Sequence, residues 1–329
     1  MRLPSKIQTR LLLCLLLGLS SGLRAETDLE KATRLIKARE FKEAQMVLEQ
    51  TVQADPRNAE ALALLGELQF PARNPKKALE YIDRAIQLDP GKARYHTLRG
   101  NALGMQAQQV NFVRAMTMVG DIRGAFEKAV QLEPGNRSAR SALFSFYFNV
   151  PGIAGGGLDK ATVFAEQTQA LDAALGHYFK GLVLQKQKKP GAAQAECRLA
   201  QAADPRFAPV YNMLGYLELE MKQVDMALEH FRKQVELDPE NANSYDSLGD
   251  GWMAKGRLDE AINAYRKALA LNPTFTASMR SLGKALEQAG RRDEAIQHYR
   301  HCAQLGVQHG IPAAVSESKE RLKALGVKE

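Results

Sequence analysis

The chain has 329 residues, of which 45% are hydrophobic and 25% are charged, a composition typical of proteins with a sizeable core. Its formal net charge is +8, but no basic block with interleaved aromatic residues occurs, so the charge does not predict a nucleic-acid-binding protein. Three cysteines in a chain of this length exclude a disulfide framework.

The first 25 residues predict a secretory signal peptide. Basic residues precede the apolar run LLLCLLLGL (11–19), and the small residues of SSGLRA follow it. The cleavage site stays open, because Ala25 has Leu23 two positions before it, whereas Ser20 and Gly22 fit the small-x-small pattern better. The run is shorter than the roughly 20 residues that span a membrane. We therefore expect a periplasmic or secreted protein, with an inner-membrane anchor through an uncleaved segment as the alternative.

Removal of this segment leaves a mild charge. Four of the 45 basic residues precede Glu26 and none of the 37 acidic residues does, so the remainder carries a net charge of about +4. This balance again gives no reason to expect a nucleic acid as partner.

A period of 34 residues organises the rest of the chain. Short similar motifs such as QLDP and ELDP end at Pro56, Pro90, Pro134, Pro205, Pro239 and Pro273. Most neighbouring prolines are 34 residues apart, but Pro90 and Pro134 are 44 apart, and Pro134 and Pro205 are 71 apart. In the unit 242–275, helical spacing and a break at Gly256 predict two helices, marked by Tyr245, Leu248, Gly249 and Trp252 and then by Ala261, Tyr265 and Ala268.

This alternation of small and large residues resembles the tetratricopeptide repeat (TPR) family. The same frame recurs at Leu214, Gly215, Ala227 and Phe231 and again at Leu282, Gly283, Ala295 and Tyr299. The resemblance implies an all-α, right-handed superhelical solenoid of about eight helix pairs, with enlarged third and fourth repeats. We expect the solenoid over 26–307, with insertions near 105–120 and 150–160. Residues 308–329 would form a C-terminal capping helix that covers the last apolar surface.

The insertion of the third repeat reads MQAQQVNFVRAMTMVG (105–120) and has two interpretations. Val110, Val113 and Met116 or Thr117 have helical spacing, which predicts longer helices that pack together. The other interpretation is an apolar ledge with three methionines that contacts a partner.

The insertion of the fourth repeat reads VPGIAGGGLD (150–159) and contains glycines at the spacing of a phosphate-binding loop. Such a loop needs Lys and Ser or Thr after its last glycine, but Leu158 and Asp159 stand there, and no parallel βαβ pattern surrounds it. We therefore expect an enlarged turn between two helices, with Asp159 at the start of the second, and no nucleotide or other cofactor.

The histidines and cysteines give no catalytic or metal-binding set. His298 and His301 are three residues apart, but no cysteine or carboxylate cluster completes a metal site. Cys197 and Cys302 lie three repeats apart at inward positions, so we expect them to be buried and unpaired. We therefore predict that the protein is not an enzyme.

The TPR resemblance also implies a concave groove lined by the first helix of each pair. The family's groove positions fall on Tyr178, Asn212, Tyr216, Asn243, Asp246, Asp250, Met253, Arg280 and Lys284. Amides can pair with a bound backbone, tyrosines offer rigid contact area, and a basic partner residue could meet both Asp246 and Asp250. The alternative is that these residues form an ordinary wet surface.

The predicted function is a protein–protein interaction scaffold or adaptor that binds a partner segment in this groove. The alternative is an accessory subunit that recruits an envelope enzyme, for example in glycan synthesis or cytochrome maturation. The partner is expected to be a protein or peptide, because nothing in the sequence predicts nucleotide or nucleic-acid binding.

Overall fold

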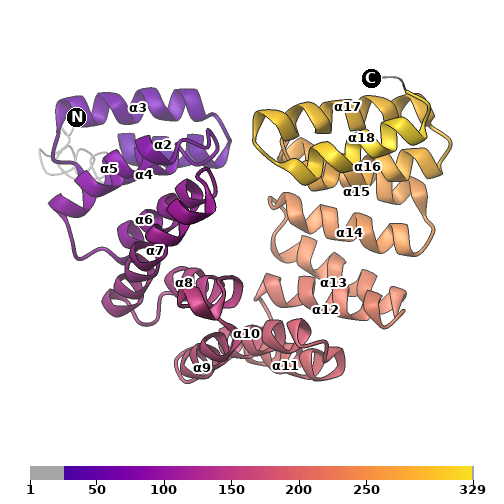
Figure 1. The fold of residues 1–329 in the computed structure, drawn as a ribbon, viewed down its shortest axis with the longest axis horizontal. Helices are drawn as coiled ribbons and strands as arrows, with labels where there is room; N and C mark the ends of the chain where they lie inside the picture. The colour runs from indigo at the N-terminus through magenta and orange to yellow at the C-terminus, as the bar shows by residue number, and fades with distance from the viewer. Residues whose placement is uncertain (1–25, 328–329) are drawn as a thin grey trace, which may run out of the picture. The chain divides into compact units, whose positions relative to one another are not determined.

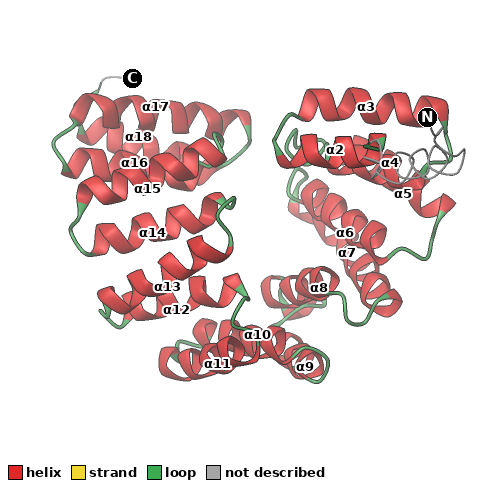
Figure 2. Ribbon diagram, turned by 180° about the vertical axis from the view of Figure 1, so that it is seen from behind, coloured by secondary structure: helices red, strands yellow, loops and turns green. Residues whose placement is uncertain are grey.

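The structure is a computed structural model that describes residues 26–327, so the predicted signal peptide (1–25) lies outside the described residues. The described range contains seventeen α-helices and one 3-10 helix, and no strand occurs between residues 26 and 327 (Figure 2). This confirms the prediction of an all-α fold. None of the helices in this range is long and apolar enough to cross a membrane.

The chain divides into two compact units, of which the first ends at Gln106. Its core forms where small residues of one helix meet large residues of the next, as Ala78 and Ile82 meet Tyr95. Its helices are α2 (Asp28–Lys37), α3 (Phe41–Ala54), α4 (Ala59–Glu67), α5 (Pro75–Leu88) and α6 (Ala93–Ala107).

The second unit begins at Ala107 and holds the longer series of helix pairs. Figure 1 shows α12 to α16 following one another in chain order, with α17 and α18 at the far end of the series, and each helix in the series packs against the next in the chain. The helices are α7 (Phe112–Leu132), α8 (Arg137–Asn149), η1 (Gly152–Ala154), α9 (Leu158–Gln169), α10 (Ala173–Lys186), α11 (Pro190–Ala203), α12 (Ala208–Glu220), α13 (Val224–Leu237), α14 (Ala242–Ala254), α15 (Leu258–Leu271), α16 (Thr276–Gln288), α17 (Arg292–Gln308) and α18 (Pro312–Ala324).

Even-numbered helices from α8 to α16 are the first helices of their pairs, and odd-numbered helices from α9 to α17 are the second helices. The first helix α14 also packs against the first helices α12 and α16, so these three helices lie next to one another on one side of the unit. The last helix, α18, packs against α16 and α17 and buries Leu322 in their apolar cluster. It therefore packs over the last helix pair of the array.

Glycine is required where the two helices of a pair approach most closely. A Cβ atom on Gly249 would lie 2.4 Å from the ring of Tyr265, and one on Gly215 would lie equally close to the ring of Phe231. Real Cβ contacts are never this short, so each large ring fills the space that its glycine leaves open. This contact explains the glycine and the aromatic residue that recur 16 positions apart in the sequence.

The turns within the pairs require a residue in the left-handed conformation. Gly256 supplies it within the pair α14–α15 and Gly290 within the pair α16–α17, both with φ of 74°. Lys188 and Lys222 stand at the equivalent points of two earlier pairs with φ near 60°, where a side chain is unfavourable. The tight turn that places each second helix on its first helix is therefore kept even where the sequence lacks glycine.

The insertion of the third repeat differs in part from the prediction. A turn separates Ala107 from Phe112, so Val110 precedes α7 and is not part of a helical stripe. The prediction of helical spacing from Val110 onward was therefore wrong. Phe112 and Val113 begin α7 and are 77% and 75% exposed.

The glycine-rich segment 150–157 forms an enlarged turn between α8 and α9. The Gly157 amide donates to the Tyr147 carbonyl at 2.8 Å, and Gly155 and Gly157 adopt φ of 88° and 108°. Glycine alone populates such angles without strain. Gly157 is the N-cap residue of α9, whereas Asp159 lies in the first turn and makes no cap hydrogen bond.

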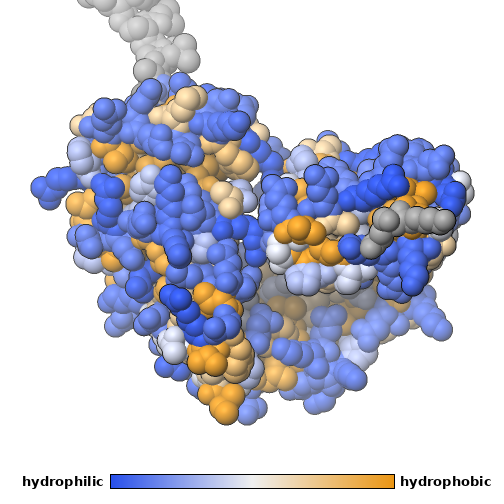
Figure 3. All heavy atoms as spheres, turned by 45° about the horizontal axis from the view of Figure 1, so that its top comes forward, coloured by the Kyte–Doolittle hydropathy of each residue, from blue (hydrophilic) through white to orange (hydrophobic). Residues whose placement is uncertain are grey.

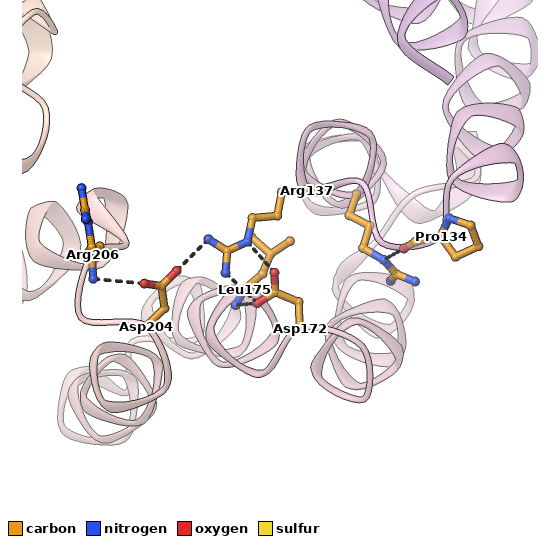
Figure 4. Close-up of polar contacts among 7 residues, drawn as sticks. Pro134, Arg137, Asp172, Leu175, Asp204 and Arg206 are labelled. Carbon is orange, nitrogen blue, oxygen red and sulfur yellow. Dashed lines mark hydrogen bonds and ion pairs between the residues drawn. The ribbon is translucent and has the colours of Figure 1, made fainter. Parts of the chain in front are cut away.

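An arginine joins the pair that contains this enlarged turn to the next pair. Arg137, at the start of α8, pairs with Asp172 at the start of α10 and, at 2.9 Å, with Asp204 at the end of α11 (Figure 4). Both carboxylates also cap backbone amides, those of Leu175 and Arg206. These contacts tie the pair α8–α9 to the pair α10–α11 despite the enlarged turn.

Candidate interaction surface on the first helices

The candidate surface lies on α12, α14 and α16, where polar side chains of successive first helices meet. Asn212 and Tyr216 are one turn apart on α12, and Asp246 and Asp250 are one turn apart on α14. Because equivalent positions of neighbouring repeats are adjacent in a stacked array, these four predicted residues come together.

Hydrogen bonds link α12 to α14 directly. The Asn212 amide donates to the Ser247 hydroxyl at 2.7 Å and to the Gln234 side chain at 3.0 Å. The Tyr216 hydroxyl donates to the Asp250 carboxylate at 2.8 Å. These bonds hold the amide and the tyrosine of α12 in fixed positions.

Asp250 also receives a hydrogen bond from behind the surface. The Tyr265 hydroxyl, on the second helix α15, donates to the other oxygen of Asp250 at 2.7 Å. Burial, followed by the nearby Asp250 carboxylate, raises the pKa of both Tyr216 and Tyr265 above the usual range. The two phenols therefore stay protonated and act as donors.

Asp246 is the most buried acid of the surface, with only 7% of the residue exposed. It accepts a hydrogen bond from the Ser278 hydroxyl of α16. Burial raises its pKa to about 6, the Ser278 bond and the charge of Arg280 oppose the rise, and the charge of Asp250 adds to it. A carboxyl group in this environment is a poor site for a strong ion pair with a partner.

The remaining predicted residues differ in how far their side chains are exposed to a binding partner. Tyr178 and Met253 pack mostly into the core, Tyr178 with its ring edge-on to that of Phe207 at 5.3 Å. Arg280 pairs with Glu317 of α18, and Asn243 and Lys284 are exposed. The surface that the structure leaves open to a partner is therefore smaller than the predicted set.

Sequence reasoning missed Ser247, Ser278 and Gln234, which complete the network. Ser278 lies 32 residues after Asp246, and Ser247 lies 35 residues after Asn212, so both pairs are close to one repeat length apart. That spacing was the available signal. We name Asn212, Tyr216, Asn243, Asp250 and Lys284 the first-helix face.

The described residues offer no alternative site for metal or thiol chemistry. Between residues 26 and 327, no group of three or more His, Cys, Asp or Glu side chains is arranged to hold a metal ion. Cys197 and Cys302 are buried free thiols, as predicted, and burial raises the pKa of the Cys197 thiol to about 12. A thiol in this state is not a nucleophile at neutral pH.

Models of the tetratricopeptide repeat match this chain over much of its described length. They match residues 35–102, 208–241, 252–290 and 278–310. The chain belongs to the tetratricopeptide repeat family. Its TPR units are the helix pairs described above, with the first-helix face built from three of them.

One relative of this TPR protein is a subunit of a complex and is distant in sequence. Anaphase-promoting complex subunit 3 of Schizosaccharomyces pombe is 24% identical over 208 residues, which are 55% of this chain and 30% of that protein. The chain thus spans less than a third of that relative's length.

Two crystal structures are similar in fold. The APC/C hetero-tetramer Cut9–Hcn1 matches with a TM-score of 0.53 and 17% identity, over 95% of this chain and 59% of that chain. Yeast Tom70 matches with a TM-score of 0.65 and 17% identity, over 91% and 64% of the two chains. At these identities the likeness shows the fold, an all-α TPR solenoid.

Proposed function

We propose that this TPR protein is a non-enzymatic scaffold that binds a segment of a partner protein on its first-helix face. One observation carries the proposal: hydrogen bonds across neighbouring repeats already hold Asn212, Tyr216 and Asp250 in place. Ordering flexible side chains costs affinity on binding, so a surface ordered in advance binds at a lower cost.

The exposed members of the face suggest how a segment is held. The Asn243 amide can pair with a peptide backbone, and the Lys284 ammonium group can meet an acidic side chain or carbonyl. The half-buried ring of Tyr216 offers contact area at little entropic cost, because few rotatable bonds must be fixed. Protein rather than nucleic acid fits a face that contains Asp250.

The names of the relatives agree with a scaffold. One is a subunit of the anaphase-promoting complex, and the Cut9 structure is a hetero-tetramer with Hcn1. Both names describe proteins within assemblies of several proteins. We propose for the present chain only this general role, the binding of another protein.

We further propose export to the periplasm or the outside of the cell, with the N-terminal 25 residues as the signal. The basic start and short apolar run support this proposal. The intact mass of the protein purified from fractionated cells should lack the signal segment. Recovery of the full-length chain from the cytosol would contradict export.

Variants of the face test the binding proposal. Affinity-tagged protein should lose its native partner when Tyr216→Ala and Lys284→Glu are combined, because one removes the ring and the other reverses the exposed charge. Asn263→Glu, on the exposed side of the second helix α15, is the matched control and should keep the partner. Retention of the partner by the double variant, with an unchanged melting temperature, would refute the proposal.

A further inference from the structure

The second helix α9 differs from the second helices α13, α15 and α17 on its outward side. Positions i, i+4 and i+7 share one side of a helix. In α9 these positions hold Asp159, Val163 and Glu166. The equivalent positions of α13, α15 and α17 instead hold an aspartate, a polar residue and an arginine: Asp225, Glu229 and Arg232; Asp259, Asn263 and Arg266; Asp293, Gln297 and Arg300.

Among these four helices, only α9 is apolar at the centre of this side. Val163 is 53% exposed and borders an open depression of about 290 Å³. The rings of Tyr147 and Phe164 also line the depression and meet edge-on at 5.7 Å. The Tyr147 hydroxyl donates to Glu127 of α7 at 3.0 Å, which fixes its ring. A partner would therefore meet a rigid apolar floor.

A depression also occurs at the equivalent place on α15, so α9 is distinguished by the apolar lining of its depression and not by the depression itself. A depression of about 570 Å³ lies there, but mainly charged and polar residues line it, among them Arg257, Asp259, Glu260 and Asn263. A hollow at the start of a second helix therefore recurs in this chain, whereas an apolar floor is found at α9. Figure 3 shows how hydrophilic residues dominate the visible surface, with hydrophobic residues in smaller patches among them.

The two carboxylates beside Val163 are available to a partner. Asp159 and Glu166 are exposed, and their side chains have no hydrogen bond or ion pair within residues 26–327. Seven residues of α-helix separate them by about 10 Å along the axis, with Val163 between them. By contrast, the nearby Lys160 ammonium group donates to the Gly155 carbonyl at 3.0 Å.

The enlarged turn is bonded to the first turn of α9 and also carries an exposed apolar residue. Lys160 ties Gly155 to the first turn of α9, and the Gly157 amide bonds to Tyr147. Ile153, in the same turn, is 97% exposed. An exposed isoleucine at the tip of a rigid turn is a ready contact for a binding partner.

We propose that the outward side of α9, formed by Asp159, Val163 and Glu166, is a second interaction surface that binds a protein segment presenting an apolar side chain between two basic ones. The apolar side chain enters the depression over Tyr147 and Phe164, and each basic group meets one of the unpaired carboxylates. This surface is separate from the first-helix face, so the two proposals fail or succeed independently. The carboxylates disfavour an anionic membrane or a nucleic acid as the occupant.

A pair of synthetic helical peptides tests the proposal. The basic peptide carries one leucine with lysines four positions before and three positions after it, on an otherwise neutral background. The acidic twin carries glutamates at the two lysine positions. Fluorescence anisotropy with the full chain at low salt should give at least tenfold tighter binding of the basic peptide, and added salt should reduce the difference.

Variants of α9 should then change the preference in a defined way. Combined Asp159→Lys and Glu166→Lys should reverse it in favour of the acidic peptide, and Val163→Gln should weaken binding of the basic peptide severalfold. Asp259→Lys on α15 is the matched control and should leave the preference as it is. Combined Asp159→Asn and Glu166→Gln, a milder pair, should abolish the preference if the charge reversal perturbs the fold.

Three results would overturn the proposal. One is equal or undetectable binding of the two peptides by the wild-type chain. Another is an equal loss of preference with Asp259→Lys, which would show a general charge effect. The third is unchanged binding after Val163→Gln, which would show that the apolar floor takes no part.

Discussion

Substitution of Asp246 by asparagine should stabilise the second unit at neutral pH and remove part of its pH dependence. Asp246 is buried, and its pKa of about 6 lies well above the ordinary value of 3.8. The charged form is therefore disfavoured in the folded state. Asparagine has the same shape, can still accept the Ser278 hydrogen bond and carries no charge to bury.

The magnitude follows from the pKa difference between the folded and unfolded chains. A rise of about two units, at about 1.4 kcal/mol per unit, corresponds to about 3 kcal/mol. Because the folded pKa is the higher one, the wild-type protein loses this amount as the pH rises from about 4 to about 6. The variant should therefore exceed the wild type by up to about 3 kcal/mol at pH 7.5 and by nothing below pH 4.

The assay is denaturant unfolding at a series of pH values, followed by tryptophan fluorescence. Trp252 is the one tryptophan of the chain and lies on α14 with Asp246, so its signal reports on this part of the second unit. Asp225→Asn, at an exposed carboxylate of α13, is the control and should show no pH-dependent difference from wild type. A less stable Asp246→Asn variant at pH 7.5, or an unchanged pH profile, would refute the reasoning.

Three further predictions concern packing, turns and thiols. Gly249→Ala should destabilise the second unit by about 1–3 kcal/mol in urea unfolding, because the new methyl group clashes with the ring of Tyr265. Lys222→Gly should raise the free energy of unfolding by about 1 kcal/mol, since the left-handed turn then carries no side chain. A thiol reagent should react slowly with Cys197 and Cys302 in the native protein, and it should count two free thiols after denaturation of a chain that starts at Glu26.

Matched glycines check the first two of these predictions. Gly124 lies within α7 with open space around its Cβ direction, so Gly124→Ala should be neutral or stabilising by up to about 1 kcal/mol. Gly256 occupies the same kind of turn as Lys222. Gly256→Lys should therefore lower the free energy of unfolding by about as much as Lys222→Gly raises it. If Gly124→Ala and Gly249→Ala changed the free energy of unfolding equally, the clash with the ring of Tyr265 would not explain the effect of Gly249→Ala.

The sequence predicted the helix pairs well because the repeat imposes the same packing many times. Gly249 and Tyr265 are 16 residues apart, as are Gly215 and Phe231, and one physical contact explains both. Where the period is interrupted, the prediction was weaker, as at Val110, which precedes α7 and does not begin a helical stripe. An insertion has no second copy in the chain against which to compare it.

The candidate surface was predicted in position but not in detail. The family frame brought Tyr216 and Asp250 together, which are 34 residues apart. It did not predict that Tyr265, a core residue of a second helix, would donate to Asp250, or that Asp246 would be buried. Those features depend on how deeply each side chain lies between helices, which a repeat pattern does not record.

The difference at α9 also emerged only from the combination of sequence and structure. Asp159, Val163 and Glu166 look ordinary in the sequence alone. Alignment of α9 with α13, α15 and α17 shows the change from arginine to glutamate at the last of these positions. Because Val163 is exposed and borders an apolar depression, the glutamate adds a second carboxylate beside an apolar surface.

The most direct test of the scaffold proposal is site-specific photo-crosslinking in the native cell. A photoreactive amino acid replaces Lys284 or Asn243 on the first-helix face, and Asn263 on α15 as the control, all three at exposed positions. The account predicts that one partner protein is crosslinked from both Lys284 and Asn243 but not from Asn263, and that Tyr216→Ala abolishes the product. Crosslinks that arise from Asn263 alone, or that persist with Tyr216→Ala, would contradict it.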